Sequence, residues 1–203
     1  MEMEFGKGTI KFSRELSSLD KLVIRFTRIL DMHGIDYVII SGYIPILFGR
    51  SRNTEDIDMF IEKMPFERFA ALWKALNGKG FECINEKDPQ EAYNSYLKDG
   101  LAPRFAAKGT FIPNFEIKFP GTKYNRYSLE HKVEVILNNE RLNISELEMQ
   151  IAFKLKLGSE KDLEDARHLY DIFKDNLDMD LLRRQVSELG AEAHAERILW
   201  KRD

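Results

Sequence analysis

The 203-residue sequence contains a single cysteine, Cys83, and this scarcity limits the kinds of protein it can be. One thiol cannot build a disulfide framework or a cysteine zinc site, and it favours a reducing compartment. The sequence also lacks an apolar run long enough to cross a bilayer. Its first twelve residues, MEMEFGKGTIKF, lack the apolar segment of a secretory signal. We therefore expect a cytoplasmic protein with no membrane-spanning segment.

Neither sign of charge dominates the composition. Lys and Arg number 31 and Asp and Glu number 34, a formal net charge of −3, and the isoelectric point is about 5.9. This balance excludes a generally basic nucleic-acid coat. The four histidines share no spacing typical of a metal site or a triad; they are His33, His131, His168 and His194. Surface or helix-end roles are expected for all four.

The stretch YVIISGYIPILFGRSRNTEDIDMFIE, residues 37–62, is the most informative part of the chain. Residues 37–41 read as a buried strand, Gly42 as a break, and residues 45–48 as a short apolar helical turn. A polar basic loop then leads to a second strand that carries Asp56 and Asp58. Strand periodicity places these two carboxylates on the same face. Adjacent carboxylates repel each other, and a divalent cation between them relieves the repulsion. The alternative is structural, with Asp56 capping a turn and Asp58 paired to an arginine.

Gly42, a helical turn and the Asp56–Asp58 pair together resemble the signature of the polymerase-β-like nucleotidyltransferase superfamily. The longer string Arg52-x-Thr54-x-Asp56-x-Asp58 is similar to a branch with abortive-infection toxin-type and archaeal minimal nucleotidyltransferases. The resemblance implies two metal-binding aspartates, Mg²⁺ or Mn²⁺ as cofactor, and an NTP such as ATP as substrate. One position departs from the pattern, because Tyr43 stands where a small, phosphate-contacting residue is expected.

Residues 111–119 are predicted to form a later strand in which polar and apolar side chains alternate. Asn114, Glu116 and Lys118 share one face, which a solvated sheet edge would also explain. The resemblance implies a third metal-binding carboxylate from a later strand of the same sheet. Glu116 is the only acidic residue between Asp99 and Glu130, so it is the candidate. Glu116 would complete the metal site and favour deprotonation of the acceptor hydroxyl.

Nucleotide contacts are expected at the turn and at nearby cations. The candidates are Ser41, Gly42, Tyr43, Arg50, Arg52 and Lys118. Arginines in a loop that enters the Asp strand are placed to meet phosphate oxygens. Solubility of the loop or an ion pair with Glu55 explains the arginines equally well, and Lys118 is equally consistent with a cross-strand ion pair. Residues 101–132 also carry a net charge of +4, which suits a phosphate-bearing substrate such as RNA or an exposed loop with chance charge.

From Ser145 onward the sequence is predicted to be helical. Ser145-Glu146-Leu147-Glu148 reads as a capping box, and Gly158 as the end of the helix that it opens. Lys154 and Asp162 are similar to Lys and Asp motifs in the C-terminal helices of the abortive-infection branch, where such residues lie against the active site. Both also have structural explanations, Lys154 near a helix C-terminus and Asp162 in a helix start.

These patterns predict an α+β fold, with a mixed sheet flanked by helices and followed by a helical bundle. The expected domains are residues 1–144, nucleotidyltransferase-like, and residues 145–203, a helical extension. The expected activity is metal-dependent transfer of a nucleoside monophosphate from an NTP to a hydroxyl of a protein, a tRNA or other RNA, or a small molecule. The alternative is a catalytically silent protein of this fold that acts as a binding or toxin–antitoxin partner. A third hypothesis is an aminoglycoside-type transferase.

Overall fold

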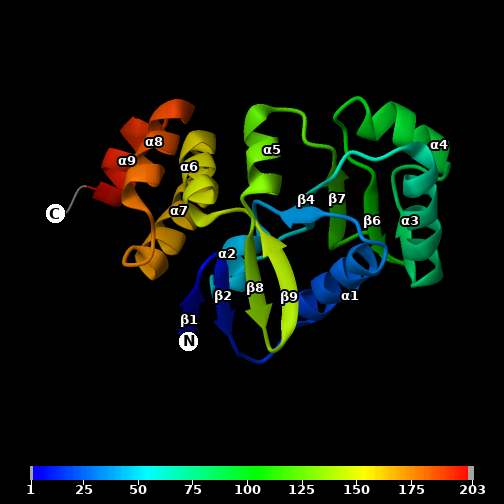
Figure 1. The fold of residues 1–203 in the computed structure, drawn as a ribbon, viewed down its shortest axis with the longest axis horizontal. Helices are drawn as coiled ribbons and strands as arrows, with labels where there is room; N and C mark the ends of the chain where they lie inside the picture. Colours follow the sequence, from blue (N-terminus) through cyan, green and yellow to red (C-terminus); the bar gives the residue numbers. More distant parts are fainter. Residues whose placement is uncertain (1, 201–203) are drawn as a thin grey trace.

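Nine strands form one mixed sheet within residues 2–200, the part of the chain that the computed structural model describes (Figure 1). Their spatial order is β1-β2-β8-β9-β3-β4-β7-β6-β5. The pairs β2 with β8, β3 with β9 and β4 with β7 are parallel, and the other neighbours are antiparallel. The strands are β1 (Met3–Gly6), β2 (Thr9–Phe12), β3 (Tyr37–Ile39), β4 (Asp56–Ile61), β5 (Phe81–Cys83), β6 (Arg104–Ala107), β7 (Asn114–Lys118), β8 (Val133–Leu137) and β9 (Glu140–Ile144).

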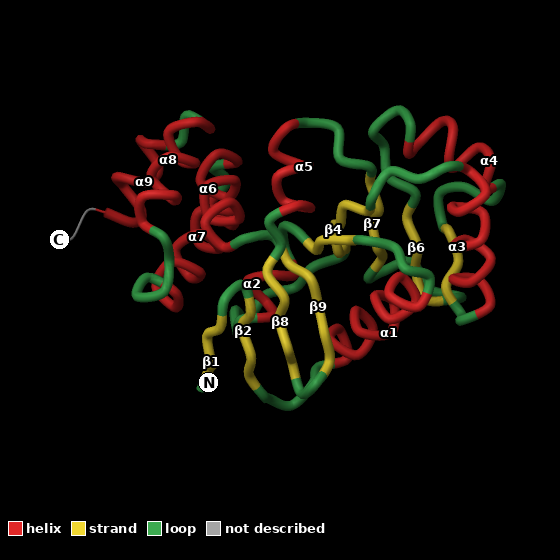
Figure 2. The backbone as a smooth tube through the Cα atoms, in the orientation of Figure 1, coloured by secondary structure: helices red, strands yellow, loops and turns green. Residues whose placement is uncertain are grey.

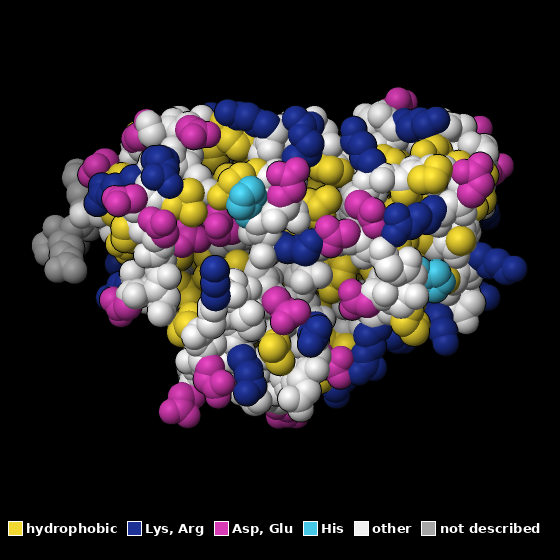
Figure 3. All heavy atoms as spheres, in the orientation of Figure 1, with side chains coloured by type: hydrophobic (Ala, Val, Ile, Leu, Met, Phe, Trp, Pro, Cys, Tyr) yellow, Lys and Arg dark blue, Asp and Glu magenta, His cyan; other side chains and the backbone are white. Residues whose placement is uncertain are grey.

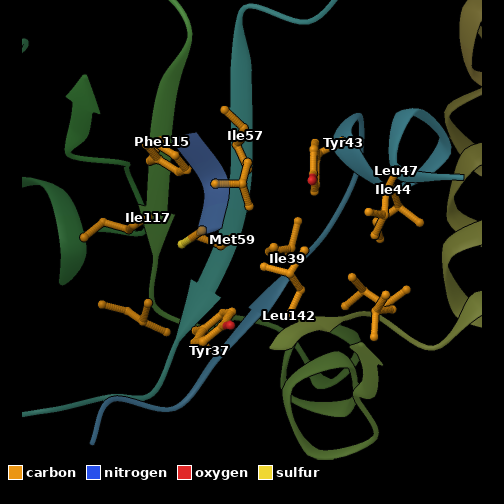
Figure 4. Close-up of a cluster of buried hydrophobic side chains, with 14 of the residues drawn as sticks. Tyr37, Ile39, Tyr43, Ile44, Leu47, Ile57, Met59, Phe115, Ile117 and Leu142 are labelled. Atoms are coloured by element: carbon orange, nitrogen blue, oxygen red, sulfur yellow. The ribbon is translucent and has the colours of Figure 1, made fainter. Parts of the chain in front are cut away.

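The two faces of the central strands differ in chemistry. On one face, alternate residues of β4 and β7 are fully buried apolar side chains, shown in Figure 4; they include Ile57, Met59, Phe115 and Ile117. Helices α1 (Ser18–Met32) and α3 (Phe66–Gly78) cover this face. Phe26 of α1 stacks on Phe115 with ring centroids 3.9 Å apart. The opposite face of the same two strands carries the acidic residues, so the apolar core fixes their direction.

The remaining helices of the first part of the chain are short. They are α2 (Tyr43–Leu47), α4 (Pro89–Glu91), which continues as a π-helix over Ala92–Leu97, and α5 (Lys123–Glu130). After β9 every described element is helical, with α6 (Leu147–Leu157), α7 (Glu160–Phe173), α8 (Met179–Leu189), α9 (Glu192–Ala195) and a π-helical turn over Glu196–Trp200. Figure 2 shows these last helices gathered at one end of the molecule, beside α5. None of the helices in residues 2–200 combines the length and apolarity needed to span a membrane.

The predicted α+β class and mixed sheet are confirmed. The strand that carries Asp56 and Asp58 lies where the sequence placed it. The last strand ends at Ile144, at the predicted boundary. Buried side chains from both sides of that boundary form one contiguous apolar cluster, so a division into two domains stays a prediction. Residue 1 and residues 201–203 of the predicted domains lie outside the described part.

Three elements differ from the prediction at the N-terminus and around α5. Strands β1 and β2 were not predicted, because β1 is mostly exposed and β2 is held by its parallel pairing with β8, more than 120 residues away. Residues 123–130 are helical rather than an exposed loop. Only Ser128 of α5 is buried, so the sequence carries no apolar stripe there, although Thr122 and Asn125 form a capping box that signals its start.

Two further differences lie at the start of β7 and at the start of α6. Strand β7 begins at Asn114, and residues 111 and 112 are exposed. Ser145 does not cap α6, whose N-cap is Glu146 without a side-chain bond. The Ser145 N–H donates instead to Ile39 O at 2.9 Å, so this residue extends the pairing of β9 with β3.

Candidate active site

The parallel pairing of β4 with β7 brings the predicted acids together. Asp56 lies in register with Asn114, and Asp58 lies in register with Glu116. Register partners in a parallel pair have side chains on the same face, so all four polar side chains line the face opposite the core. Glu116 therefore faces Asp58 and is not turned away from it.

A lysine occupies the space between Asp58 and Glu116. The Lys118 Nζ lies 2.9 Å from Glu116 Oε2 and 3.4 Å from Asp58 Oδ1. Arg104 of β6 binds the other Glu116 oxygen at 2.6 Å. Lys118 thus forms a cross-strand ion pair with Asp58, which is one of the two roles that the sequence allowed for it. Both oxygens of Glu116 have cationic partners in this structure.

The pKa values of these acids reflect their crowding. Burial raises the pKa of Asp58; Lys118 opposes the rise and the charges of Asp56 and Glu116 reinforce it, so the net direction is upward. Burial also raises the pKa of Glu116, but the hydrogen bonds and charges of Lys118 and Arg104 outweigh it and hold this pKa below its usual value. Glu116 is therefore a carboxylate at neutral pH.

The donor set suits a metal that arrives with its substrate. Within residues 2–200, no group of three or more Asp, Glu, His or Cys side chains is arranged to hold a metal ion by itself. Asp56 is half-buried and has no ion-pair partner among the described residues. Mg²⁺ is usually bound by one or two carboxylates together with water and substrate phosphates, and not by an all-protein cage. Asp56 and Asp58 provide such a pair of hard oxygen ligands, whereas Glu116 is engaged by cations.

The turn after β3 is shaped by close contacts. Ser41 has a left-handed backbone with φ +62°, and Gly42 is the N-cap of α2. Arg52 Nη2 donates to Gly42 O at 2.9 Å. A Cβ at position 42 would lie 2.7 Å from that same Nη2 atom, so any larger residue here would displace the Arg52 guanidinium group.

The Tyr43 side chain is directed away from Asp56, Asp58 and Glu116. Its side chain is fully buried, beside Ile44 and Leu47 in Figure 4. The Tyr43 hydroxyl donates to Asp20 Oδ1 at 2.7 Å. Burial and the Asp20 carboxylate raise the pKa of Tyr43, so the phenol stays protonated. The tyrosine at the unusual position therefore does not extend into the site, and the predicted nucleotide contact at Tyr43 would have to come from its backbone.

Arg50 and Arg52 point toward helix α7, where the buried carboxylate of Asp165 holds both. Arg50 Nη1 lies 2.7 Å from Asp165 Oδ1, and Arg52 Nη2 lies 3.0 Å from Asp165 Oδ2. Arg50 also pairs with Glu164. The structure thus places these predicted phosphate ligands in ion pairs. Asp165 was not among the predicted site residues. It is fully buried and links the loop before β4 to the helical tail, by which we mean the helices over Leu147–Trp200.

Lys154 and Asp162 contact each other. Lys154 Nζ lies 2.6 Å from Asp162 Oδ1 and 2.9 Å from Asp165 Oδ2. The Asp162 N–H donates to the Oγ of the N-cap Ser159 at 3.2 Å, which is the helix-start bond, and the Ser159 hydroxyl also donates to Asp162 Oδ2 at 2.6 Å. Burial raises the pKa of Asp162, and the bonds from Lys154 and Ser159 lower it further than burial raises it.

A cavity of about 160 Å³ lies on the acidic face, between β4 and helices α5 and α6. Asp58 and Lys154 are its charged lining residues, and Ser41 and Gln150 are among its polar ones. Apolar walls come from Ile40, Phe60, Phe153 and Leu157. Gln150 was not predicted as a site residue, although it lies one helical turn before Lys154, a spacing that places both on one face of α6.

The net positive stretch of residues 101–132 is distributed over several elements and packs partly on the tail. Tyr127 donates to Glu146 Oε2 at 2.9 Å, and Tyr124 donates to Glu188 O at 3.2 Å. Burial and Glu146 raise the pKa of Tyr127 to about 12. Figure 3 shows basic and acidic side chains interspersed on this face of the molecule. These tyrosine hydroxyls hold α5 against the tail.

Comparison with known proteins places the fold. The chain matches no protein-family model and no curated protein. Among solved structures it is similar to an antigenic nucleotidyltransferase-like protein from Paracoccidioides brasiliensis, with a TM-score of 0.58 and 16% identity over 92% of this chain and 99% of that one.

Two structures of ANT(2'')-Ia are also similar. The complex with adenylyl-2''-tobramycin has a TM-score of 0.56 and 12% identity, over 87% of this chain and 99% of that one. The solution structure of this antibiotic-resistance factor has a TM-score of 0.54 and 13% identity, over 87% and 94%. Together with the register of β4 and β7, these likenesses show that the chain has a nucleotidyltransferase-like fold.

Proposed function

We propose that this protein transfers a nucleoside monophosphate from an NTP to a hydroxyl group, with Mg²⁺ or Mn²⁺ as cofactor. The observation that carries the proposal is the register of Asp58 with Glu116, which sets two acids from distant parts of the chain face to face. Asp56 lies two residues from Asp58 on the same face, and a cavity adjoins the Asp58 side chain. Crowded acids beside a cavity are typical of sites that bind cationic or metal-bound ligands.

Each side chain has a distinct part in this proposal. Asp56 and Asp58 hold the metal, which when bound neutralises phosphate charge and polarises the reacting phosphoryl group. The acceptor oxygen bonds to the α-phosphorus as its proton passes to the ionised Glu116, and the bond between the α-phosphorus and the β-phosphate oxygen breaks, so that pyrophosphate leaves. Lys118 keeps Glu116 oriented toward Asp58. The cavity walls, which include Phe60 and Phe153, limit water around the reacting groups.

The acceptor that we favour is a small molecule with a free hydroxyl. This preference rests on ANT(2'')-Ia, whose structure contains an adenylylated tobramycin and covers 87% of this chain at a TM-score of 0.56. An RNA or protein acceptor is the competing possibility. An assay with labelled NTP separates these classes, as set out below.

The pairing of cations supports a second candidate, a catalytically silent protein of this fold that acts as a binding or toxin–antitoxin partner. Arg50, Arg52, Lys154 and Lys118 all have carboxylate partners in this structure. A triphosphate would have to compete with those carboxylates for the same cations. If a triphosphate cannot displace these carboxylates, the protein has the fold of a nucleotidyltransferase but does not catalyse the transfer.

Calorimetry with Mg²⁺ and each of the four NTPs tests the two candidates. The transferase predicts NTP binding that requires Mg²⁺ and is lost in Asp58→Asn. Asp171→Asn is the control, because Asp171 pairs with Arg167 on the exposed side of α7. Failure of all four NTPs to bind the wild-type protein would support the silent partner.

Label transfer identifies the acceptor. The protein is incubated with α-³²P-labelled NTPs, Mg²⁺ and either a panel of aminoglycosides or a host lysate, and the labelled product is separated by size and by nuclease and protease sensitivity. A small labelled product supports the favoured acceptor class. Label in RNA or protein would replace it, and an unlabelled aminoglycoside panel would remove the aminoglycoside-type hypothesis.

A further inference from the structure

Gln150 of α6 holds both backbone polar groups of Ser41. The Ser41 N–H donates to Gln150 Oε1 at 3.1 Å, and Gln150 Nε2 donates to Ser41 O at 2.9 Å. A side-chain amide offers one acceptor and two donors, so it can bind both groups of one residue in this way. Gln150 is 4% exposed, and 109 residues separate it from Ser41.

The residue held by this amide is in an unusual conformation. Ser41 has φ +62°; the other non-glycine residues with positive φ within residues 2–200 are Asn138 and Asn139, in the tight turn between β8 and β9. Asparagine is enriched in the left-handed region, but serine has no such preference. Non-glycine residues held there are over-represented at ligand clamps and active sites.

Ser41 lies close to Asp58. The N–H of the preceding residue, Ile40, donates to Asp58 O at 3.0 Å, so the turn begins where the ladder of β3 with β4 ends. Ser41, Gln150 and Asp58 line the same cavity. The next carbonyl, that of Gly42, is held by Arg52, which Asp165 of α7 orients.

We propose that Gln150 is a positioning residue for the nucleotide: it fixes the Ser41–Gly42 turn against Asp58 so that the turn and the acids present one binding surface. This inference rests on the nucleotidyl transfer proposed above. The helical tail thereby supplies part of the site's geometry without supplying a reacting group. Removal of the amide frees Ser41 to leave the left-handed conformation, and the turn loses its alignment with Asp58.

The test compares two buried glutamines of the tail. Gln150→Leu removes both bonds to Ser41. Gln185→Leu is the matched control, because Gln185 is also 4% exposed but donates to Glu146 Oε2, away from the cavity. Gln150→Glu is the second variant, because it preserves the size of the side chain and the acceptor for the Ser41 N–H but turns a carboxylate toward the Ser41 carbonyl.

Two measurements are made on the full-length protein: calorimetric affinity for each NTP with Mg²⁺, and hydrogen exchange of the Ser41 amide by NMR. Gln150→Leu is expected to weaken NTP binding about tenfold and to speed exchange of the Ser41 amide. Gln150→Glu is expected to weaken binding in the same direction. Gln185→Leu is expected to change neither measurement, although it lowers stability.

The possible failures are distinguishable. Wild-type protein that binds no NTP overturns the proposed function, whatever Gln150 does. Wild-type binding that Gln150→Leu and Gln150→Glu both preserve overturns the positioning role alone. Equal losses in Gln150→Leu and Gln185→Leu also overturn it, because a general loosening of the tail would then explain both.

Discussion

Asp58 on β4 lies in register with Glu116 on β7, and the Lys118 ammonium contacts both carboxylates. Lys118 thus provides, from within the chain, positive charge at the place where a divalent cation would be expected. Two carboxylates that face each other on neighbouring strands repel each other unless a cation lies between them. In the proposed function, a metal bound at Asp58 would therefore compete with Lys118.

We expect Lys118→Met to tighten the binding of Mn²⁺ alone by about tenfold, because one competing positive charge is removed. The same variant should unfold more easily in metal-free buffer, by about 1–3 kcal/mol, because Asp58 loses its ion pair and Glu116 keeps only Arg104. Titration calorimetry and urea unfolding measure the two effects. Lys74→Met, at an exposed position of α3, is the control. Unchanged Mn²⁺ affinity would contradict the competition.

Asp165→Asn should be among the most destabilising single substitutions in the chain. Asp165 is fully buried and binds three cations: Arg50, Arg52 and Lys154. Removal of its charge leaves these cations partly buried without their shared partner, which typically costs about 3–5 kcal/mol. Asp171→Asn on the same helix removes only an exposed i,i+4 pair with Arg167, worth about 0.5 kcal/mol. Urea unfolding of both variants provides the comparison, and a loss below about 1 kcal/mol in Asp165→Asn would contradict it.

The central sheet could be predicted because its strands carry local patterns. Residues 56–59 and 114–118 alternate charged or polar side chains with apolar ones, and the apolar set is the one that packs under α1 and α3. The Asp-x-Asp spacing fixed the shared face of Asp56 and Asp58. The family resemblance implied a further carboxylate from a later strand, and the only acid there, Glu116, lies in register with Asp58.

The contacts between the tail and the site could not be predicted in the same way. Gln150 meets Ser41 across 109 residues, and Asp165 meets Arg52 across 113. Helical periodicity shows only that Gln150 and Asp165 lie on the inner faces of α6 and α7. It does not show which distant residue each of them contacts. Tyr43 could not be assigned either, because the local sequence does not show that its hydroxyl reaches Asp20 of a preceding helix.

Asp20 should contribute to the loss of stability in acid. Burial raises its pKa, but bonds from Arg14, Ser17 and Tyr43 to the ionised form outweigh burial and hold the pKa below its usual value. A carboxyl whose pKa is lower in the folded state stabilises the protein above its unfolded pKa of about 3.9, and this contribution is lost as the pH falls through the folded pKa.

The comparison variant is Asp20→Asn, which cannot ionise. We expect it to be less stable than the wild type at pH 7, by on the order of 2 kcal/mol, because charge-assisted bonds are lost. The difference between the two proteins should shrink as the pH is lowered below about 4. Urea unfolding at pH 7, 4 and 3 measures the difference. A gap that stays constant over this range would show that Asp20 keeps the same pKa on folding.

Gly42→Ala tests the close approach of Arg52 to the turn. A Cβ at position 42 would lie 2.7 Å from Arg52 Nη2 and 3.2 Å from Thr54 Oγ1, so the guanidinium group must move. Its bonds to Gly42 O and Asp165 would be strained together, and we expect a loss of about 1–3 kcal/mol.

Gly78→Ala is the matched control for that substitution. Gly78 is the last residue of α3, and a Cβ there would meet no atom within 4 Å. Alanine is a better helix former than glycine, so this variant should be neutral or more stable by up to about 1 kcal/mol. If the two variants unfold at the same urea concentration, Arg52 is free to move, and the turn does not depend on its contact with Gly42. If only Gly42→Ala loses stability and NTP affinity together, the glycine is required by the packing of Arg52, because Gly42 has a negative φ that alanine adopts without strain.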